Sequence, residues 1–489
     1  MRIIPICRTF FLGSLLLFSH TPLLIAEEDA DFDELLEGFD DSENNSGDAN
    51  SGADSGVSSN DESLDELMDG FEEQTLTPSA PTMATVRRNW DLVTLLSLSS
   101  SYNYQHQAPA TDETDYRGLS RLKIKVQPEL RYKFNTNWDS VVIANGFYDM
   151  AYSINDRDQY TNETLENYES ELEFRDAYIR GTLTNSLDIK IGRQIVVWGK
   201  SDSIRVVDVL NPLDFREPGM VDIEDLRLPV TMIKADYYFN QWNFSAIAIP
   251  EIRFNKVPVY GSDFYVADQK APDETIPNHI ENSEFALALE GIFSGWDLSF
   301  HYANHYDDQA HMILNNGKPI RQEHSRLNLL GVASNIAFGD YLLKIESAYI
   351  DGLEFASTST EFSRVDFLMG VDYSGFTDTT LSVEAVNRKL LDYESELSTS
   401  IDRTDENEGQ IALRYSGSFI HDKINITALA AILGTDFDAG AYYRGSIEYE
   451  LMNATSVTLG GIVYQSGDNF LLERIAQNDR VFFDLRYSF

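Results

Sequence analysis

The chain has 489 residues, a formal net charge of −43 and a mean hydropathy of −0.29. So acidic a chain is a poor partner for nucleic acid, because phosphates repel it. Its one cysteine, Cys7, precedes an apolar run near the N-terminus, so we expect neither disulfides nor thiolate metal sites in the rest of the chain.

The first 26 residues have the pattern of a secretory signal peptide. Arg2 and Arg8 form a basic region, an apolar run covers residues 10–25, and Ala26 precedes a group of acids. The apolar run is short for a membrane helix, and a small residue stands where a signal peptidase cuts. Residues 1–26 are therefore predicted to be a signal peptide that directs export.

Residues 27–87 are predicted to be a disordered acidic segment in the periplasm, because they hold too few apolar residues to form a core. Two similar decapeptides, residues 32–41 and 64–73, recur within the segment. Their apolar residues are spaced i, i+3, i+4 and i+7, as on one face of a short helix. We expect each copy to dock a partner; the alternative is a solubilising spacer. The docking residues would be Phe32, Leu35, Leu36, Phe39, Leu64, Leu67, Met68 and Phe71.

Residues 88–489 are predicted to form an all-β transmembrane antiparallel barrel of about 18 strands (16–18). In residues 121–134 apolar side chains alternate strictly with polar ones, which gives one face for lipid and one for water. Tight turns and long polar connections also alternate along the chain, as in outer-membrane barrels. The tight turns are expected at 135–137, 185–186, 240–241, 294–295, 339–340, 374–375, 421–422 and 453–454.

Tryptophans give a second indication of a barrel. Trp90, Trp138, Trp242 and Trp296 each open a predicted strand at the tight-turn end, where they would form an aromatic girdle. Trp198 falls at the other end of its strand and is expected in the outer girdle.

The C-terminal residues 481–489 are apolar at every odd position and end in Phe489. This pattern resembles the signal by which the barrel-assembly machinery recognises its clients. Leu485, Tyr487 and Phe489 are the residues expected to carry that signal. The alternative is an edge strand of a secreted sandwich.

The stretch from Gly192 to Pro229 is a long predicted outer loop, rich in turn residues and in charges of both signs. We expect it to fold into the lumen and narrow it; the alternative is a structured surface loop. Alternation fails at 175–176 and at 192–193, so a bulge at each is expected to turn charged residues inward. The predicted lumen residues are Arg175, Asp176, Arg193, Lys200, Asp202, Arg205, Asp208, Asp214 and Arg216.

About forty residues here resemble an uncharacterised "domain of unknown function" family of proteobacterial outer-membrane barrels. The matching motifs are Gly192-Arg193-Gln194, Trp198-Gly199, Asn211-Pro212, Asp214 and Pro218-Gly219. Family members are often encoded beside RND exporters of the MMPL type and a lipoprotein-sorting-like lipoprotein. The resemblance implies a role in moving a lipid or other apolar compound. Members commonly carry an acid after the Trp-Gly pair, where this chain has Lys200.

Other clusters are weaker indications of chemistry. Residues 301–311 hold three histidines and two aspartates that could ligate a metal, although hydrated lumen and loop positions explain them better. Acidic pairs at 156/158 and 436/438 could hold calcium between lipopolysaccharide phosphates. We expect no metal and no cofactor. Nothing pairs a nucleophile with a base, so the chain is not expected to be an enzyme.

The sequence thus predicts an outer-membrane channel or transfer component that works with a periplasmic or RND-type export system for an apolar or lipid-like compound. The alternative is a self-sufficient diffusion porin; a barrel enzyme or adhesin has no supporting residues. The expected partners are the barrel-assembly machinery, lipopolysaccharide and other outer-membrane lipids, and an RND-type transporter or periplasmic lipoprotein bound through the acidic tail.

Overall fold

The computed structural model describes residues 89–109, 114–221, 226–277, 280–356, 358–401 and 403–489. The predicted signal peptide, the acidic segment and its two repeats lie outside these residues. None of the helices in the described part of the chain is long and apolar enough to cross a membrane.

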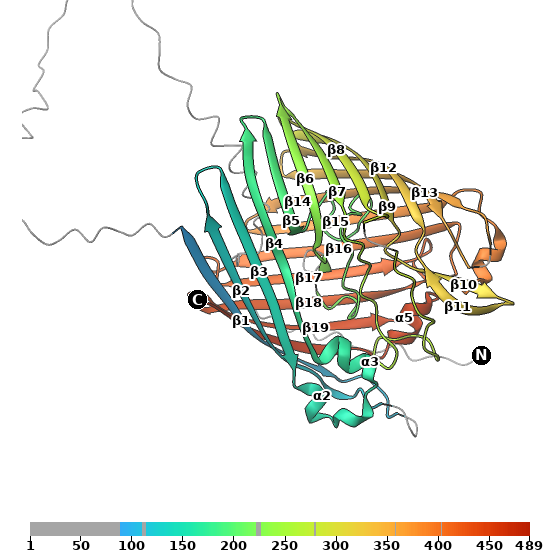
Figure 1. Ribbon diagram of the computed structural model, residues 1–489. Coiled ribbons are helices and arrows are strands. Elements are labelled where there is room, and N and C mark those ends of the chain that lie inside the picture. The colour runs from blue at the N-terminus through green and yellow to red at the C-terminus, as the bar shows by residue number, and fades with distance from the viewer. Residues whose placement is uncertain (1–88, 110–113, 222–225, 278–279, 357, 402) are drawn as a thin grey trace, which may run out of the picture. The chain divides into compact units, whose positions relative to one another are not determined.

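Eighteen antiparallel strands form one closed barrel (Figure 1). Each strand pairs with its neighbours in the chain, β9 pairs directly with β12, and β1 pairs with β20 to close the ring. The predicted class and the predicted count of 18 strands are confirmed. The strands of the barrel are β1 (Trp90–Asn103), β2 (Gly118–Lys133), β3 (Trp138–Asp149), β4 (Ser170–Thr184), β5 (Leu187–Gln194), β6 (Val230–Phe239), β7 (Trp242–Ile249), β8 (Glu284–Phe293), β9 (Trp296–Tyr306), β12 (Arg326–Phe338), β13 (Tyr341–Leu353), β14 (Phe362–Phe376), β15 (Thr379–Leu390), β16 (Asn407–Phe419), β17 (Ile424–Leu433), β18 (Gly440–Met452), β19 (Thr455–Gln465) and β20 (Arg480–Ser488).

Several short elements lie outside the barrel wall, at the end of the barrel that carries the long loops. A separate hairpin, β10 (His311–Asn315) with β11 (Lys318–Glu323), follows β9. The helical turns are α2 (Ala151–Ile154), η2 (Arg157–Gln159), α3 (Asn162–Thr164), η3 (Leu165–Glu169), η4 (Ser395–Thr399) and α5 (Phe470–Ile475).

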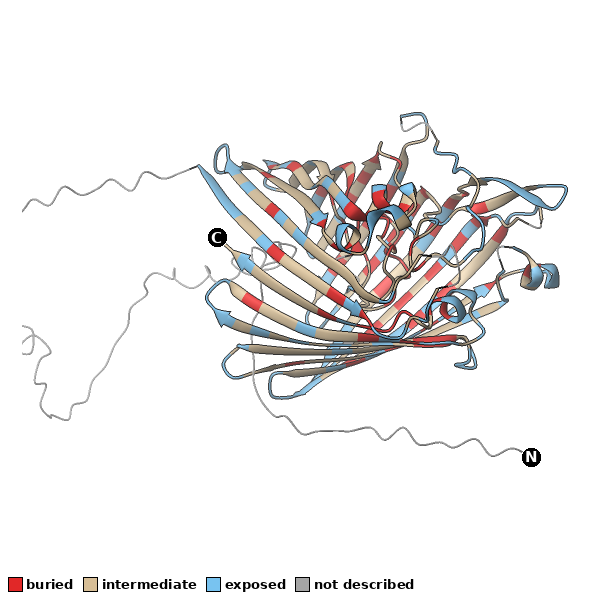
Figure 2. Ribbon diagram, turned by 90° about the horizontal axis from the view of Figure 1, so that it is seen from below, coloured by how far each residue is buried: buried red, intermediate tan, exposed pale blue. Residues whose placement is uncertain are grey.

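The strands carry the alternation that the sequence predicted. In β2, Ile124, Val126 and Leu130 are each more than 40% exposed, whereas Gln127 is buried. Apolar side chains face outward because a barrel in lipid is surrounded by hydrocarbon, and polar ones face the lumen. Figure 2 shows buried residues alternating with more exposed ones along the strands.

Tight turns lie where the sequence placed them, with one exception. The turn predicted at 374–375 follows Phe376 instead, at Thr377–Asp378. The difference arises because a register shift between Tyr373 and Phe376 lets β14 continue past Gly375.

The tryptophans at the tight-turn end occupy the predicted positions. Trp90 and Trp296 are 46% and 43% exposed, and the ring of Trp296 stacks on Phe293 at 4.3 Å between centroids. The expectation for Trp198 is wrong: it is 3% exposed and lies inside the barrel. The physical reason is that β5 ends at Gln194, so Trp198 belongs to the following loop.

The strands of the barrel differ in length. This difference determines where the connection from β5 to β6 leaves the wall. β5, β6 and β7 have 8, 10 and 8 residues, whereas β4 has 15. Pairing between β4 and β5 runs from Ala177–Arg193 to Thr184–Leu187, so Ser170–Asp176 extend beyond the end of β5. The connection from β5 to β6 therefore leaves the wall early.

Candidate functional site

Residues 195–221 and 226–229, here called the crossing loop, lie in the interior of the barrel between β5 and β6. Their buried side chains include Trp198, Ile204 and Val207, which join an apolar cluster with Leu329 of β12 and Leu368 of β14. Along the ring of paired strands, β12 and β14 are five and seven strands away from β5 (β6, β7, β8, β9, β12, β13, β14). The loop therefore reaches the far wall.

Close packing fixes the apolar part of the crossing loop. The Trp198 ring lies against His301 of β9, with 4.7 Å between ring centroids. Gly331 of β12 faces Val207 so closely that an added Cβ would come within 2.7 Å of the valine Cγ1. At such a position only glycine leaves room for the loop.

Glu346 of β13 holds the start of the crossing loop through its backbone. Its carboxylate accepts hydrogen bonds from the backbone N–H groups of Lys200 at 2.6 Å, Ser201 at 2.9 Å and Val207 at 3.3 Å. The Glu346 residue is fully buried. Hydrogen bonds to a carboxylate are stronger than those between neutral groups, so one side chain fixes three loop residues.

Glu384 of β15 provides a second, parallel anchor. It accepts from Ser201 Oγ at 2.6 Å and from the N–H groups of Asp202 at 2.9 Å and Ser203 at 3.0 Å. Lys344 of β13 offsets the negative charge, with Nζ 2.5 Å from Asp202 and 3.6 Å from Glu384. The far wall thus carries a polar cradle for residues 200–207.

Charges within the crossing loop pair with one another. Asp208, which is almost fully buried, lies 3.0 Å from Arg227 and 3.2 Å from Arg205. Arg205 also donates to the backbone carbonyl of Asn211 at 2.9 Å, and Lys200 lies 3.2 Å from Asp297 of β9. A buried charge is tolerated only when it is paired in this way.

The second half of the crossing loop contacts strands near both chain ends. Tyr464 of β19 donates to the backbone carbonyl of Pro218 at 2.6 Å, and Gly219 adopts a φ of +75° there. Met220 packs with Ile462 in a second apolar cluster. Glu217 forms an ion pair with Arg121 of β2.

The ion pair of Glu217 leads to a prediction about acid. Burial raises the pKa of Glu217, but the positive charges of Arg121, Lys123 and Arg480 together outweigh burial and lower this pKa from 4.5 to about 2. A carboxylate whose pKa is lowered in the folded protein contributes stability at pH values above its ordinary pKa. For Glu217 this contribution is at most about 3 kcal/mol, and it is lost as pH falls towards about 2. We expect ion conductance in planar bilayers to stay constant from pH 7 to 5 and to rise as pH falls from about 4.5 towards 2. Glu217→Gln should conduct more already at pH 7 and show a smaller acid response.

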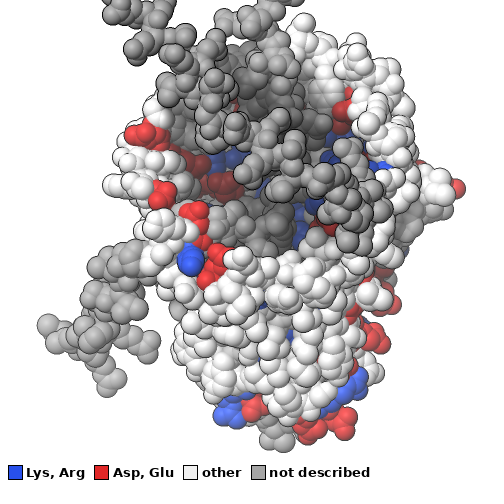
Figure 3. Space-filling model, turned by 90° about the vertical axis from the view of Figure 1, so that its left-hand side faces the viewer, with Lys and Arg blue, Asp and Glu red and all other residues white. Residues whose placement is uncertain are grey.

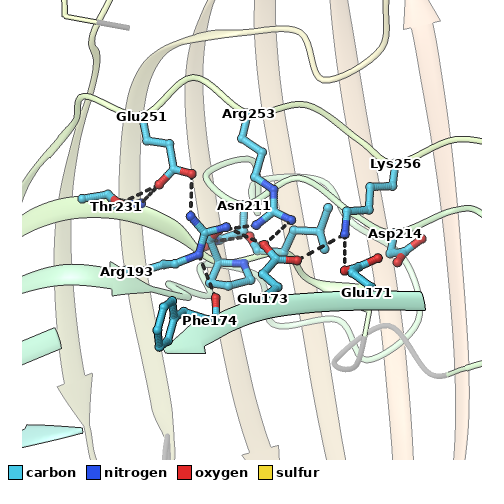
Figure 4. Close-up of polar contacts among 12 residues, drawn as sticks. Glu171, Glu173, Phe174, Arg193, Asn211, Asp214, Thr231, Glu251, Arg253 and Lys256 are labelled. Carbon is cyan, nitrogen blue, oxygen red and sulfur yellow. Dashed lines mark hydrogen bonds and ion pairs between the residues drawn. The ribbon is translucent and has the colours of Figure 1, made fainter. Parts of the chain in front are cut away.

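A second polar group lies where β4 extends beyond β5 (Figure 4). Arg193 lies 2.6 Å from both Glu173 of β4 and Glu251, which follows β7. Arg253 lies 2.6 Å from Glu173, and Lys256 lies 2.6 Å from Glu171. Three segments, namely β4, β5 and the residues after β7, thus meet in one charge network.

The structure places the predicted lumen residues in three groups. A register shift between β3 and β4 lies at the expected 175–176 position, where Asp176 pairs with Ile143 and Phe174 with Ala144. Lys200, Asp202, Arg205 and Asp208 lie in the first half of the crossing loop. The network around Glu171 and Glu173 takes in Arg193, Asp214 and Arg216.

The bulge expected at Gly192–Arg193 is absent, and that prediction is wrong. Gly192 and Arg193 pair with Tyr178 and Ala177 in continuous register, and Gly192 takes a φ of +132°. The guanidinium of Arg193 reaches past the short end of β5 to Glu173 and Glu251. The ion-pair partners of Arg193 are these two acids.

Sequence reasoning missed Glu346, Glu384 and Lys344, the anchors of the crossing loop. Their one signal is alternation, since Lys344 and Glu346 interrupt an apolar strand at lumen-facing positions. Alternation gives the face of the barrel but not the partner.

The histidines that were weighed as metal ligands have other neighbours. His301 packs on Trp198, and His305 Nδ1 lies 2.7 Å from the carbonyl of Tyr306. Burial raises the pKa of Asp307 and of Asp308 in the adjoining loop. Among the described residues no three potential ligands come together as a metal site.

These features define a class: porin-like β-barrels of the outer membrane with a loop folded into the lumen. Solved structures share the architecture at low identity. OccAB1 of Acinetobacter baumannii has a TM-score of 0.51 at 10% identity, covering 82% of this chain and 96% of that chain. OccAB2 of the same species has a TM-score of 0.49 at 8% identity, covering 82% and 98%.

The family model described as "Protein of unknown function (DUF1302)" matches residues 110–489. The chain belongs to that family, which agrees with the resemblance seen in the loop motifs. No curated protein matches the chain by sequence.

Proposed function

We propose that this protein is an outer-membrane channel that transfers an apolar or lipid-like compound past a lumen crossed by its own loop. The carrying observation is the apolar cluster at the level of the crossing loop. It joins Trp198, Val207 and Leu210 to Leu329 and Leu368 of the far wall. A diffusion porin keeps a polar, water-filled lumen, so this interior favours an apolar substrate over ions.

The outer membrane as location rests on the fold and on the outer surface. Viewed from the side that carries the C-terminus, the molecule shows a broad uncharged surface beside a hollow in which charges of both signs lie (Figure 3). An uncharged band suits contact with lipid. The tight-turn end would face the periplasm, as in barrels of this type.

The test compares two probes in Gram-negative cells that express the protein. Entry of N-phenyl-1-naphthylamine, an apolar dye, reports transfer of an apolar compound. Nitrocefin hydrolysis by a periplasmic β-lactamase reports aqueous diffusion. Faster dye entry with little change in nitrocefin hydrolysis supports the proposal. The reverse result favours the second candidate, a passive diffusion porin. The charged residues in the hollow of Figure 3 support that candidate.

We further propose that the two acidic repeats dock a periplasmic lipoprotein or an RND-type transporter. Each repeat offers an apolar row with an acidic rim, the form of a ligand for a hydrophobic groove. We expect such a partner to co-purify with the full protein and to be lost when Phe39→Ala and Phe71→Ala are combined. The matched control changes Ser51 and Ser55 of the intervening linker to Ala. Equal recovery of the partner from both variants would contradict docking through the repeats.

A further inference from the structure

The barrel wall changes its construction at one place, between β4 and the elements that follow it. From Ala177 to Thr184, β4 is joined to β5 by strand pairing, whereas Ser170–Asp176 extend past the end of β5. Across from this extension lie residues 251–256, which follow β7. Their backbone is tied inward: Lys256 donates to the carbonyl of Leu213 at 2.9 Å and accepts from Phe215 at 2.7 Å.

Ion pairs bridge this part of the wall (Figure 4). Glu173 contacts three cations, and Glu171 contacts two. The distances are 2.6 Å from Glu173 to Arg193, 2.6 Å to Arg253 and 3.2 Å to Lys256, and from Glu171 2.6 Å to Lys256 and 2.8 Å to Arg216. We call this group the seam network. It joins β4 both to the segment after β7 and to the crossing loop.

Apolar surface lies on both sides of the seam network. On β4, Leu172 and Phe174 point outward and are 84% and 57% exposed. Behind the network, Ile249 and Ile252 are buried. Leu172 is more exposed than any other large apolar side chain in the described residues. A molecule with an apolar chain would thus find apolar contacts before and after the charged layer.

Ion pairs and strand ladders differ in how they open. Parting two strands inside lipid leaves backbone N–H and C=O groups without partners, at several kcal/mol each. Parting ion pairs moves side chains that can exchange partners, and here Glu173 has three cations to choose from. The wall is therefore easiest to open at the seam network.

From this geometry we propose that the seam network closes a lateral gate. Through it, the apolar chain of an amphipathic substrate passes between the lumen and the outer leaflet. The inference rests on the proposed function, because only a substrate that favours lipid gains from a lateral route.

The test locks the gate covalently in the full chain. Glu171→Cys and Lys256→Cys are combined with Cys7→Ser, which leaves no other thiol. A short bismaleimide is then added to cells. N-ethylmaleimide modifies the same thiols without linking them. The matched pair Asp139→Cys and Arg180→Cys replaces an ion pair of 3.1 Å between directly paired residues of β3 and β4.

We expect the cross-link at the seam to abolish entry of N-phenyl-1-naphthylamine and to leave nitrocefin hydrolysis unchanged. N-ethylmaleimide and the β3–β4 cross-link should affect neither. Continued dye entry with the seam cross-linked overturns the gate and leaves the proposed function standing. Absence of dye entry before any cross-linking removes the proposed function, and the gate with it.

Hydrogen exchange gives a readout that does not depend on transport. In Glu171→Gln with Glu173→Gln, backbone exchange of residues 170–176 should accelerate by about tenfold, while residues 178–184 keep their rate. Asp139→Asn serves as the control on the same wall. Unchanged exchange at 170–176 would show that ion pairs do not hold the seam.

Discussion

Replacing Glu346 and Glu384 together by Ala should raise the ion conductance of the purified barrel several-fold. Each carboxylate accepts three hydrogen bonds from the crossing loop. A buried donor that loses its acceptor costs about 1–3 kcal/mol. The six donors of residues 200–207 then regain partners only from water, so the loop should leave the far wall. Single-channel recording in planar bilayers measures the change.

Two further variants make this experiment decisive. Glu346→Gln keeps a carbonyl oxygen as acceptor and should conduct much less than the double Ala variant. Glu290→Ala removes an acid from β8, near the tight-turn end of the barrel, and should conduct as the unaltered protein does. If the double variant conducts no more than Glu290→Ala, the two carboxylates do not hold the loop.

Trp198→Ala should make the crossing loop sensitive to protease while the barrel stays folded. The indole is 3% exposed and packs on His301, and removing a large buried aromatic side chain costs about 3–5 kcal/mol. That cost falls on loop docking, because the strands keep their own ladder hydrogen bonds. Limited proteolysis followed by mass spectrometry should locate cleavage within residues 195–229.

The control for Trp198 is Trp296→Ala at the lipid-facing rim, where the ring is 43% exposed. That variant should leave the loop as resistant as before. Resistance of the loop in Trp198→Ala would contradict the view that apolar packing holds the loop, and would leave the two carboxylates as its main anchors.

Local patterns were enough to predict the barrel, because a transmembrane strand shows its environment in every second residue. Residues 121–134 display this alternation fully, and the turns follow from residues such as Asn240 and Gly295 that take positive φ. The turn after Phe376 was misplaced because a bulge adds residues that no period-two pattern reveals.

The site was harder to predict because its contacts join residues far apart in the chain. The loop's fold into the lumen followed from its turn residues and charges, but Glu346 lies 146 residues from the Lys200 amide that it binds. Trp198 resembled a girdle residue because only packing on His301 distinguishes the two roles. Arg193 pairs with Glu173 and Glu251 beyond the end of β5. Sequence spacing does not reveal these pairs.

The anchoring of the crossing loop also constrains the order in which the barrel folds. The loop lies between β5 and β6, yet its anchors are on β13 and β15, and Tyr464 of β19 holds its second half. The last strand pairs with the first, Ser488 against Leu95. Contacts between such distant residues form late in folding. A chain that ended before β15 would have an open barrel wall and would lack the Glu384 anchor of the crossing loop. The loop can therefore block the lumen only when nearly the whole chain has folded.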